Sequence, residues 1–274
     1  MLRQLIFYGF IVSIVLLLYT ILLYFLQRSF IYFPTAEIPN RQNLHAENIQ
    51  QIKLHTKDNL LLNSWYKTAE PNKPTILYFH GNAGNIGGRI FLARQFINAG
   101  FGVLLLEYRG YGGNEGQPTE QGLYQDGRAA IDFLQQQKIT TKQLVLYGES
   151  LGTGVATQLA TEFSVCAVIL QSPYTSLKAL ARYHYFWLPV IKMRDKFDSL
   201  ARINKIKAPL LMLHGTKDLV VPYAEGVKLF NYANEPKQWV DLPNKGHNNL
   251  WDLNFTNKVK QFINTHCQAN FHQD

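Results

Sequence analysis

Hydrophobic positions divide the chain into a short apolar part and a long mixed part. Residues 5–26 (LIFYGFIVSIVLLLYTILLYFL) contain no charged side chain. A helix of that length measures about 33 Å, against about 30 Å for the hydrocarbon core of a bilayer. A cleaved signal peptide would have an apolar run of only about 7–15 residues before a small-residue cleavage site, whereas this run continues into Gln27, Arg28 and Ser29. The pattern predicts an uncleaved, single-pass membrane anchor over residues 1–28.

The charges that flank the apolar run give a weak indication of its orientation. Arg3 and the amino terminus lie on one side, and Arg28 and the more distant Arg41 lie on the other. Cytoplasmic flanks are usually enriched in Lys and Arg, and here the two sides are nearly balanced. We expect the amino terminus in the cytoplasm and the folded domain on the extracytoplasmic side.

The remaining 246 positions, 29–274, have the pattern of one α/β catalytic domain. Two stretches, 49–56 and 60–67, read as an opening hairpin. Short apolar runs then follow at 75–80, 102–107, 144–148, 166–170, 209–215 and 238–242. Helical patterns lie between or after them, near 87–99, 120–137, 151–163, 222–233 and 249–265. Continuous apolar runs are typical of strands buried on both faces. The alternation therefore predicts a mostly parallel central sheet with helices on both faces.

The first chemical signal lies at the end of the apolar run 144–148. The chain continues there as Gly148-Glu149-Ser150-Leu151-Gly152, and a helical pattern follows. A G-x-S-x-G sequence between a strand and a helix is a nucleophile elbow, in which a tight turn exposes the serine. The alternative, a serine in an ordinary turn, is weaker in this strand–turn–helix context. We therefore predict that Ser150 is a nucleophile.

A serine nucleophile needs a general base, and the base needs an orienting acid. Asp218 comes just after the run 209–215, and His247 lies in the loop after the run 238–242. The carboxyl ends of parallel strands carry the chemistry of such sheets. The order Ser, Asp, His along the chain is that of the α/β-hydrolases. The sequence thus predicts a triad of Ser150, Asp218 and His247.

Other histidines and aspartates fit the triad less well. His80 and His214 each precede a glycine at a strand end, where a histidine more often holds a loop by hydrogen bonds. Asp241 is expected inside a strand and Asp252 inside a helix. Four more histidines lie in edge or terminal segments, at positions 45, 55, 266 and 272.

Acyl transfer also requires donors for the oxyanion that develops on the attacked carbonyl. The backbone N–H of Leu151, the residue after the nucleophile, is one expected donor. The other should come from the loop 80–85 (HGNAGN), whose small residues let the backbone approach closely. We expect the backbone N–H of Asn82 in this role. The loop lacks the G-x-x-x-x-G-K-[ST] pattern of a phosphate-binding loop.

Composition excludes several other classes of protein. With 47% apolar and 17% charged residues, the chain is neither a disordered protein nor a coiled coil. Of the net charge of +8, +6 lies in residues 178–207, which hold eight basic and two acidic side chains, and no nucleic-acid-binding motif accompanies this patch. Two cysteines, Cys166 and Cys267, are too few for a disulfide scaffold or a cysteine-built zinc site. We expect both to be free thiols.

The segment 175–207 occupies the position of a lid. It combines the basic residues with the aromatic stretch 183–188 (YHYFWL). One interpretation is that the aromatic rings line an acyl pocket or pack on the core while the cations face water. The other is that the lid rests on the bilayer, with the rings at headgroup depth and the cations near anionic lipid.

The motifs together resemble the serine α/β-hydrolases, in particular the membrane-anchored bud-emergence-type hydrolases and their relatives among protein depalmitoylases. The resemblance is carried, in order, by residues 27–34, 80–84 (HGNAG), 107–112 (EYRGYG), 148–152 (GESLG), 172–174 (SPY), 214–218 (HGTKD) and 246–247. It implies a single-pass anchor, a Ser–Asp–His hydrolase and no metal or organic cofactor. Arg109 is expected to be a structural tie, and Glu149 has no assigned role.

The predicted function is hydrolysis of a carboxyl ester or thioester through an acyl-enzyme. The expected partners are an acyl substrate, which includes lipids and acylated proteins, and the membrane through residues 5–26, with no nucleic acid. One alternative is a peptidase or amidase with the same triad. Another is a non-catalytic, membrane-anchored scaffold of the same fold.

Overall fold

The centre of the molecule is a twisted sheet, seen in the computed structural model, which describes residues 2–185 and 193–267. Within these residues, eight strands pair in the order β10-β9-β8-β7-β4-β6-β3-β2. Their bounds are β2 Gln50–His55, β3 Leu61–Lys67, β4 Thr75–Phe79, β6 Gly102–Leu106, β7 Leu144–Glu149, β8 Ala167–Gln171, β9 Leu210–Gly215 and β10 Lys237–Leu242. The β2–β3 and β3–β6 pairs are antiparallel and the others are parallel. The predicted hairpin and mostly parallel sheet are confirmed.

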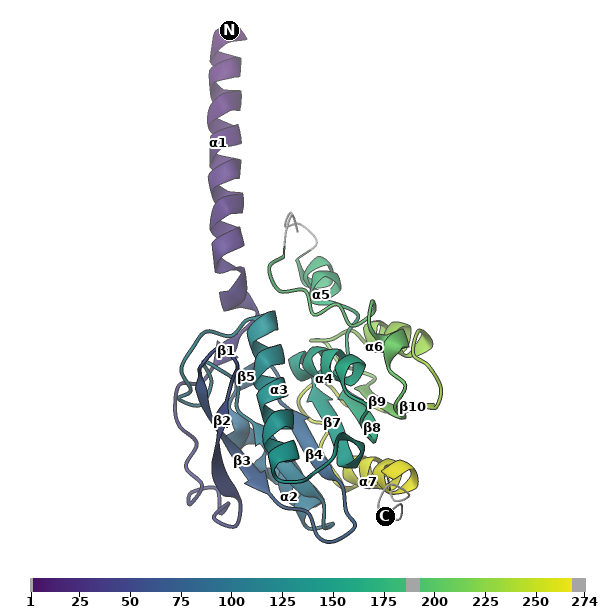
Figure 1. Ribbon diagram of the computed structural model, residues 1–274. Coiled ribbons are helices and arrows are strands. Elements are labelled where there is room, and N and C mark those ends of the chain that lie inside the picture. Colours follow the sequence, from purple (N-terminus) through teal and green to yellow (C-terminus); the bar gives the residue numbers. More distant parts are fainter. Residues whose placement is uncertain (1, 186–192, 268–274) are drawn as a thin grey trace.

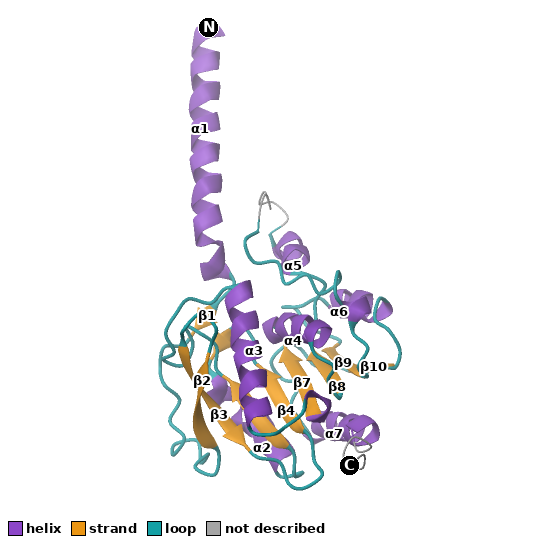
Figure 2. Cartoon of the chain, viewed as in Figure 1, coloured by secondary structure: helices purple, strands orange, loops and turns teal. Residues whose placement is uncertain are grey.

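Helices cover both faces of the sheet, as predicted (Figure 2). One face packs against α3 (Glu120–Gln136), α4 (Leu151–Glu162) and α6 (Tyr223–Asn231), and the other against α2 (Ile90–Ile97) and α7 (Leu253–Cys267). Strand side chains alternate between the two cores. In β4, for example, Leu77 and Phe79 join the first core, whereas Ile76 and Tyr78 join the second. Both faces are apolar because both are buried, which explains the unbroken apolar runs in the sequence.

Helix α1 (Leu2–Leu26) projects from the domain as a long rod, and the short helix η1 (Gln27–Phe30) follows it (Figure 1). None of its residues is buried. Its length and apolar composition are sufficient to cross a membrane. It leaves the domain at the end where α5 lies, and the C-terminus lies at the opposite end. The division into an anchor over 1–28 and a catalytic domain over 29–274 stays a prediction.

The predicted lid segment contains α5 (Leu177–His184) and the short helix η4 (Ile203–Lys205). Phe186, Trp187, Leu188 and Lys192, which belong to the lid as the sequence defines it, lie outside the described residues. The remaining elements are η2 (Ile86–Arg89), η3 (Thr141–Gln143) and a two-stranded parallel ribbon of β1 (Phe33–Pro34) and β5 (Ala83–Gly84).

The two cysteines form a disulfide, so the prediction of two free thiols is wrong. Cys166 immediately precedes β8, and Cys267 is the last residue of α7. Because α7 packs against the face of the sheet to which Cys166 belongs, their Cα atoms lie 5.6 Å apart, which is within the range that a disulfide spans. A separation of 101 residues hides this neighbourhood in the sequence.

Arg109 ties a loop to two distant segments, as expected. Its Nη1 donates to Asp58 Oδ2 at 2.6 Å, and its Nε donates to Asp126 Oδ1 at 2.8 Å. Burial raises the pKa of Asp126 to about 6, and the Arg109 guanidinium opposes a further rise. These two contacts hold the loop that follows β6 against α3 and against the β2–β3 turn.

Candidate active site

The turn between β7 and α4 presents Ser150. Its backbone has φ 50° and ψ −115°, an unusual conformation for a residue with a side chain. A Cβ atom at Gly148 would lie 2.5 Å from the Gly152 carbonyl oxygen, and one at Gly152 would lie 2.0 Å from the Phe79 carbonyl oxygen. Only glycine allows these approaches, so the two glycines of the motif let the helix begin directly against the sheet.

The structure brings Ser150, His247 and Asp218 together from three strand ends. His247 Nε2 lies 2.9 Å from Ser150 Oγ, and His247 Nδ1 lies 2.7 Å from Asp218 Oδ2. Asp218 follows β9, and His247 lies between β10 and α7. The imidazole can therefore bridge the hydroxyl and the carboxylate, which is the arrangement required for a general base with an orienting acid.

Asp218 is held as an anion. Its Oδ1 accepts hydrogen bonds from the backbone N–H groups of Val220 and Val221, at 2.9 Å and 2.8 Å. His214 Nε2 lies 3.4 Å from Asp218 Oδ2. Burial alone would raise the pKa of Asp218, but hydrogen bonds from His214 and His247 outweigh it, so the pKa lies well below its usual value. Asp218 therefore remains ionised beside His247 at neutral pH.

The competing residues have other partners. Asp241 accepts hydrogen bonds from Trp239 and Tyr223. Asp252 lies just before α7 rather than inside a helix; it pairs with Lys245 and accepts a hydrogen bond from the Phe255 N–H.

The competing histidines hold loops, as expected. His80 Nδ1 lies 2.7 Å from the Gly81 carbonyl, and His214 Nε2 lies 3.0 Å from the Val221 carbonyl. His272 lies outside the described residues.

The loop with Asn82 is braced by the segment that follows the apolar helix. The Phe33 N–H donates to the Asn82 carbonyl at 2.9 Å, the Asn82 amide Nδ2 donates to the Ile31 carbonyl at 3.0 Å, and the Tyr111 hydroxyl donates to the Asn82 carbonyl at 2.8 Å. Parallel pairing of β1 with β5 continues this contact. Leu151 begins α4, where first-turn N–H groups lack helical acceptors. Both predicted oxyanion donors therefore lie in backbone of fixed conformation.

Glu149, which the sequence left without a role, links the elbow to this loop. Arg89 donates from Nε and Nη2 to the two Glu149 carboxylate oxygens, each at 3.0 Å, and from Nη1 to the Ala83 carbonyl at 3.0 Å. The Tyr78 hydroxyl donates to Glu149 at 2.8 Å. Burial would raise the pKa of Glu149, but the Arg89 guanidinium outweighs it and lowers the pKa. No sequence motif indicated this pair.

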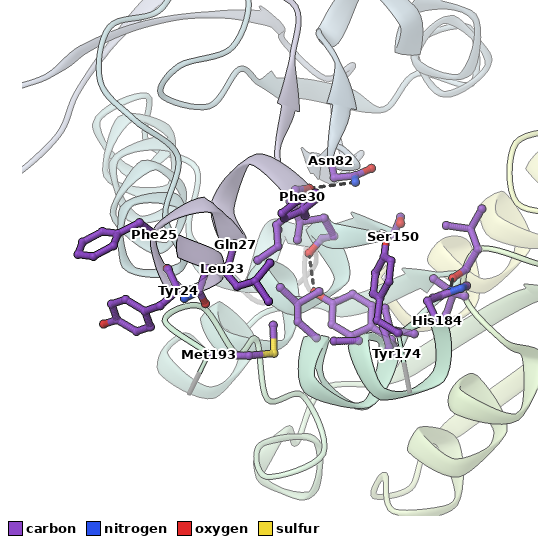
Figure 3. A pocket seen from close by; sticks show the side chains of 18 of the residues that line it. Leu23, Tyr24, Phe25, Gln27, Phe30, Asn82, Ser150, Tyr174, His184 and Met193 are labelled. Atoms are coloured by element: carbon purple, nitrogen blue, oxygen red, sulfur yellow. Dashed lines mark hydrogen bonds between the residues drawn. The ribbon is translucent and has the colours of Figure 1, made fainter. Parts of the chain in front are cut away.

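A cavity of about 800 Å³ opens from Ser150 toward helix α1 and α5. Figure 3 shows Leu23, Gln27 and Phe30 from the first segment of the chain on one side of it and Ser150 on the other. Apolar side chains make up most of its lining. Among the described residues, no group of three or more His, Cys, Asp or Glu side chains could hold a metal ion.

A serine at such an elbow, in such a sheet, defines the class of the α/β-hydrolases. Sequence comparison agrees: residues 70–196 match the family described as serine aminopeptidase, S33. The Mycobacterium tuberculosis protein Rv2307c is 39% identical over 81% of this chain and 80% of its own length. Protein bem46 of Schizosaccharomyces pombe is 34% identical over 82% of this chain and 81% of its own length. The chain therefore belongs to the α/β-hydrolase family, in the branch that includes bem46.

One further relative and one solved structure of similar fold carry names that describe an activity. The lysophosphatidylserine lipase ABHD12 of Danio rerio is 36% identical over 63% of this chain, which spans only 51% of that protein. The structure of the Pyrococcus furiosus esterase Pf2001 superposes with a TM-score of 0.71, covering 86% of this chain and 98% of that one at 19% identity. At that identity the likeness establishes the fold alone.

Proposed function

We propose that this protein is a serine hydrolase that cleaves carboxyl esters or thioesters through a covalent acyl-enzyme. The observation that carries the proposal is the continuous contact from Ser150 Oγ through His247 to Asp218, at 2.9 Å and 2.7 Å, at the floor of an apolar cavity. The relative named as a lipase supports an ester substrate. The chain is a hydrolase by family. The proposal therefore concerns the type of bond that it cleaves, the residues that catalyse the cleavage and the class of substrate.

In the proposed reaction, His247 Nε2 accepts the Ser150 proton as Ser150 Oγ attacks the acyl carbonyl. The N–H groups of Asn82 and Leu151 stabilise the oxyanion of the tetrahedral intermediate. His247 then donates the proton to the departing alcohol or thiol, which leaves an ester of the acyl group on Ser150. A water molecule, deprotonated by His247, attacks this ester. The acid is released as His247 returns the proton to Ser150 Oγ. Asp218 keeps the proton of neutral His247 on Nδ1, which frees Nε2 to act as the base.

The proposed location is a membrane, with the catalytic domain on the extracytoplasmic side. Helix α1 is long and apolar enough to span the bilayer. The Cys166–Cys267 disulfide supports the extracytoplasmic side, because disulfides persist in oxidising compartments and are rare in the cytosol.

A peptidase with the same triad is the second candidate, because the matching family carries the description serine aminopeptidase. We expect the purified protein to hydrolyse p-nitrophenyl and thioester substrates far faster than p-nitroanilides with the same acyl group. We also expect a fluorophosphonate probe to label Ser150. Faster cleavage of amino-acid p-nitroanilides would favour the peptidase. Absence of labelling and of all hydrolysis would favour a non-catalytic scaffold.

The brace between Ile31, Phe33 and Asn82 leads to a prediction about truncation. Removal of residues 1–28 leaves the brace intact, so hydrolysis of p-nitrophenyl acetate should stay close to that of the full chain. Removal of residues 1–36 deletes the brace, and kcat/KM should fall about 100-fold or more, as expected when one oxyanion donor is lost. Circular dichroism reports whether both truncated proteins are folded. Equal esterase activity in two folded truncated proteins would contradict the role of Asn82.

A further inference from the structure

We propose that the last two turns of α1 form a wall of the acyl-binding site, so that one long acyl chain of a bilayer-embedded ester reaches Ser150 along α1. The inference rests on the proposed ester hydrolysis and specifies its substrate as a lipid held in the membrane. It gives α1 a part in substrate selection in addition to anchoring.

The exposure of α1 shows which of its faces meets the domain. Along Leu2–Leu26, Thr20 and Leu23 are partly covered while every other position is exposed, and Gln27 continues the covered stripe in η1. Spacings of three and four residues place these side chains on one face of a helix. Leu23 points into the cavity from this face in Figure 3. The neighbouring Leu22 remains 53% exposed and is not among the residues that line the cavity.

The other walls of the cavity come from the lid segment and the catalytic floor. Leu177, Leu180 and Ala181 of α5 line it together with Met193, and Ser150 and Tyr174 lie at its base. Figure 3 shows Leu23 and Met193 on one side of the cavity and Ser150 and His184 on the other. The site is therefore an apolar channel between α1 and α5 that ends at the nucleophile.

Polar contacts fix the end of α1 against the lid segment. Arg28 donates from Nε and Nη2 to both carboxylate oxygens of Asp195, at 2.8 Å and 3.3 Å, and Asp195 is almost completely buried. The Arg194 N–H donates to the Gln27 side-chain oxygen at 2.7 Å. The Asp195 carboxylate also accepts a hydrogen bond from the Glu120 N–H at 3.0 Å. These contacts hold the two walls at a defined separation, which a site selective for chain shape requires.

The position of the wall on α1 identifies the occupant. The lining begins at Tyr19 and Thr20, within the stretch that is apolar enough to lie in a bilayer. An acyl chain that entered there would pass from lipid into a cavity lined mostly by apolar groups. The rise from Thr20 to Leu26 is about 9 Å along α1, and Gln27–Phe30 of η1 separate this stretch from Ile31, so a short ester bound at Ser150 would leave the α1 part of the channel empty. We therefore assign the channel to a long acyl chain.

The test compares Leu23→Trp with Leu22→Trp in the full chain, reconstituted in phosphatidylcholine vesicles. The two variants change the same residue type at adjacent positions of α1, and only Leu23 lines the channel. The measured quantity is the ratio of kcat/KM for p-nitrophenyl palmitate to that for p-nitrophenyl acetate. We expect Leu23→Trp to lower this ratio about tenfold, the effect of displacing roughly two methylene groups from apolar contact. Leu22→Trp should leave the ratio unchanged.

Two further measurements make the result decisive. Labelling by a fluorophosphonate establishes that each variant retains a folded site, and Leu180→Trp, which intrudes from α5 on the opposite wall, should lower the ratio as Leu23→Trp does. An unchanged ratio in labelled Leu23→Trp would overturn the α1 wall, even if Leu180→Trp shifts it. Equal shifts in Leu22→Trp and Leu23→Trp would also overturn it. If the unmodified protein hydrolyses neither ester, the proposed function itself fails.

Discussion

Replacement of Ser150 by alanine is expected to lower kcat/KM for p-nitrophenyl esters by about 10⁴-fold or more, as loss of a triad nucleophile does in serine hydrolases. The hydroxyl contacts His247 Nε2 at 2.9 Å and belongs to neither apolar core. The free energy of unfolding should therefore change little. Initial rates and urea denaturation in detergent provide the two measurements. A folded variant that retained esterase activity would remove Ser150 from the mechanism.

Replacement of Asp218 by asparagine is expected to lower kcat by about 10³–10⁴-fold. The amide oxygen of the variant side chain could still accept hydrogen bonds from the Val220 and Val221 N–H groups, which now donate to Asp218 Oδ1. The amide nitrogen would then face His247 Nδ1, where Asp218 Oδ2 now lies at 2.7 Å. An amide donor there favours the tautomer with the proton on Nε2, in which the imidazole cannot accept the Ser150 proton.

Asp241→Asn is the matched control for this substitution. Asp241 lies in the neighbouring strand β10, its register partner in β9 is His214, and its carboxylate contacts Trp239 and Tyr223 rather than His247. We expect its kcat to stay within about twofold of the unmodified protein, because surface substitutions of this kind have small effects. A comparable loss in both variants would show that the effect arises from charge near the sheet edge and not from the tautomer of His247.

The sequence predicted the parts of the site that depend on local pattern. The Gly148–Gly152 motif could be placed because its glycines, the preceding strand and the following helix are contiguous. Asp218 and His247 could be placed because parallel strands bring their carboxyl ends to one edge. Residues that meet only through tertiary packing gave no such signal. The Glu149–Arg89 pair spans 60 residues, and Gln27, at the end of the covered face of α1, contacts Arg194 167 residues later in the chain.

The state of the two cysteines also depends on tertiary packing that the sequence pattern does not show. Free thiols and a disulfide have the same sequence, and the choice depends on whether α7 packs back on the edge of β8 where Cys166 lies. The compartment also decides it, and the balanced charges around α1 said little about the compartment.

Helix α1 leaves the domain at the end remote from the C-terminus (Figure 1), and its last turns line the cavity that contains Ser150. This arrangement affects how the substrate arrives. With α1 in a bilayer and η1 bound to Asp195, the channel faces the leaflet at all times, and an ester arrives by lateral diffusion in two dimensions. The velocity should then depend on the mole fraction of ester in the leaflet and be insensitive to the amount of ester per volume of suspension. Dilution of the ester with inert lipid would slow turnover, whereas dilution of the whole vesicle suspension would not.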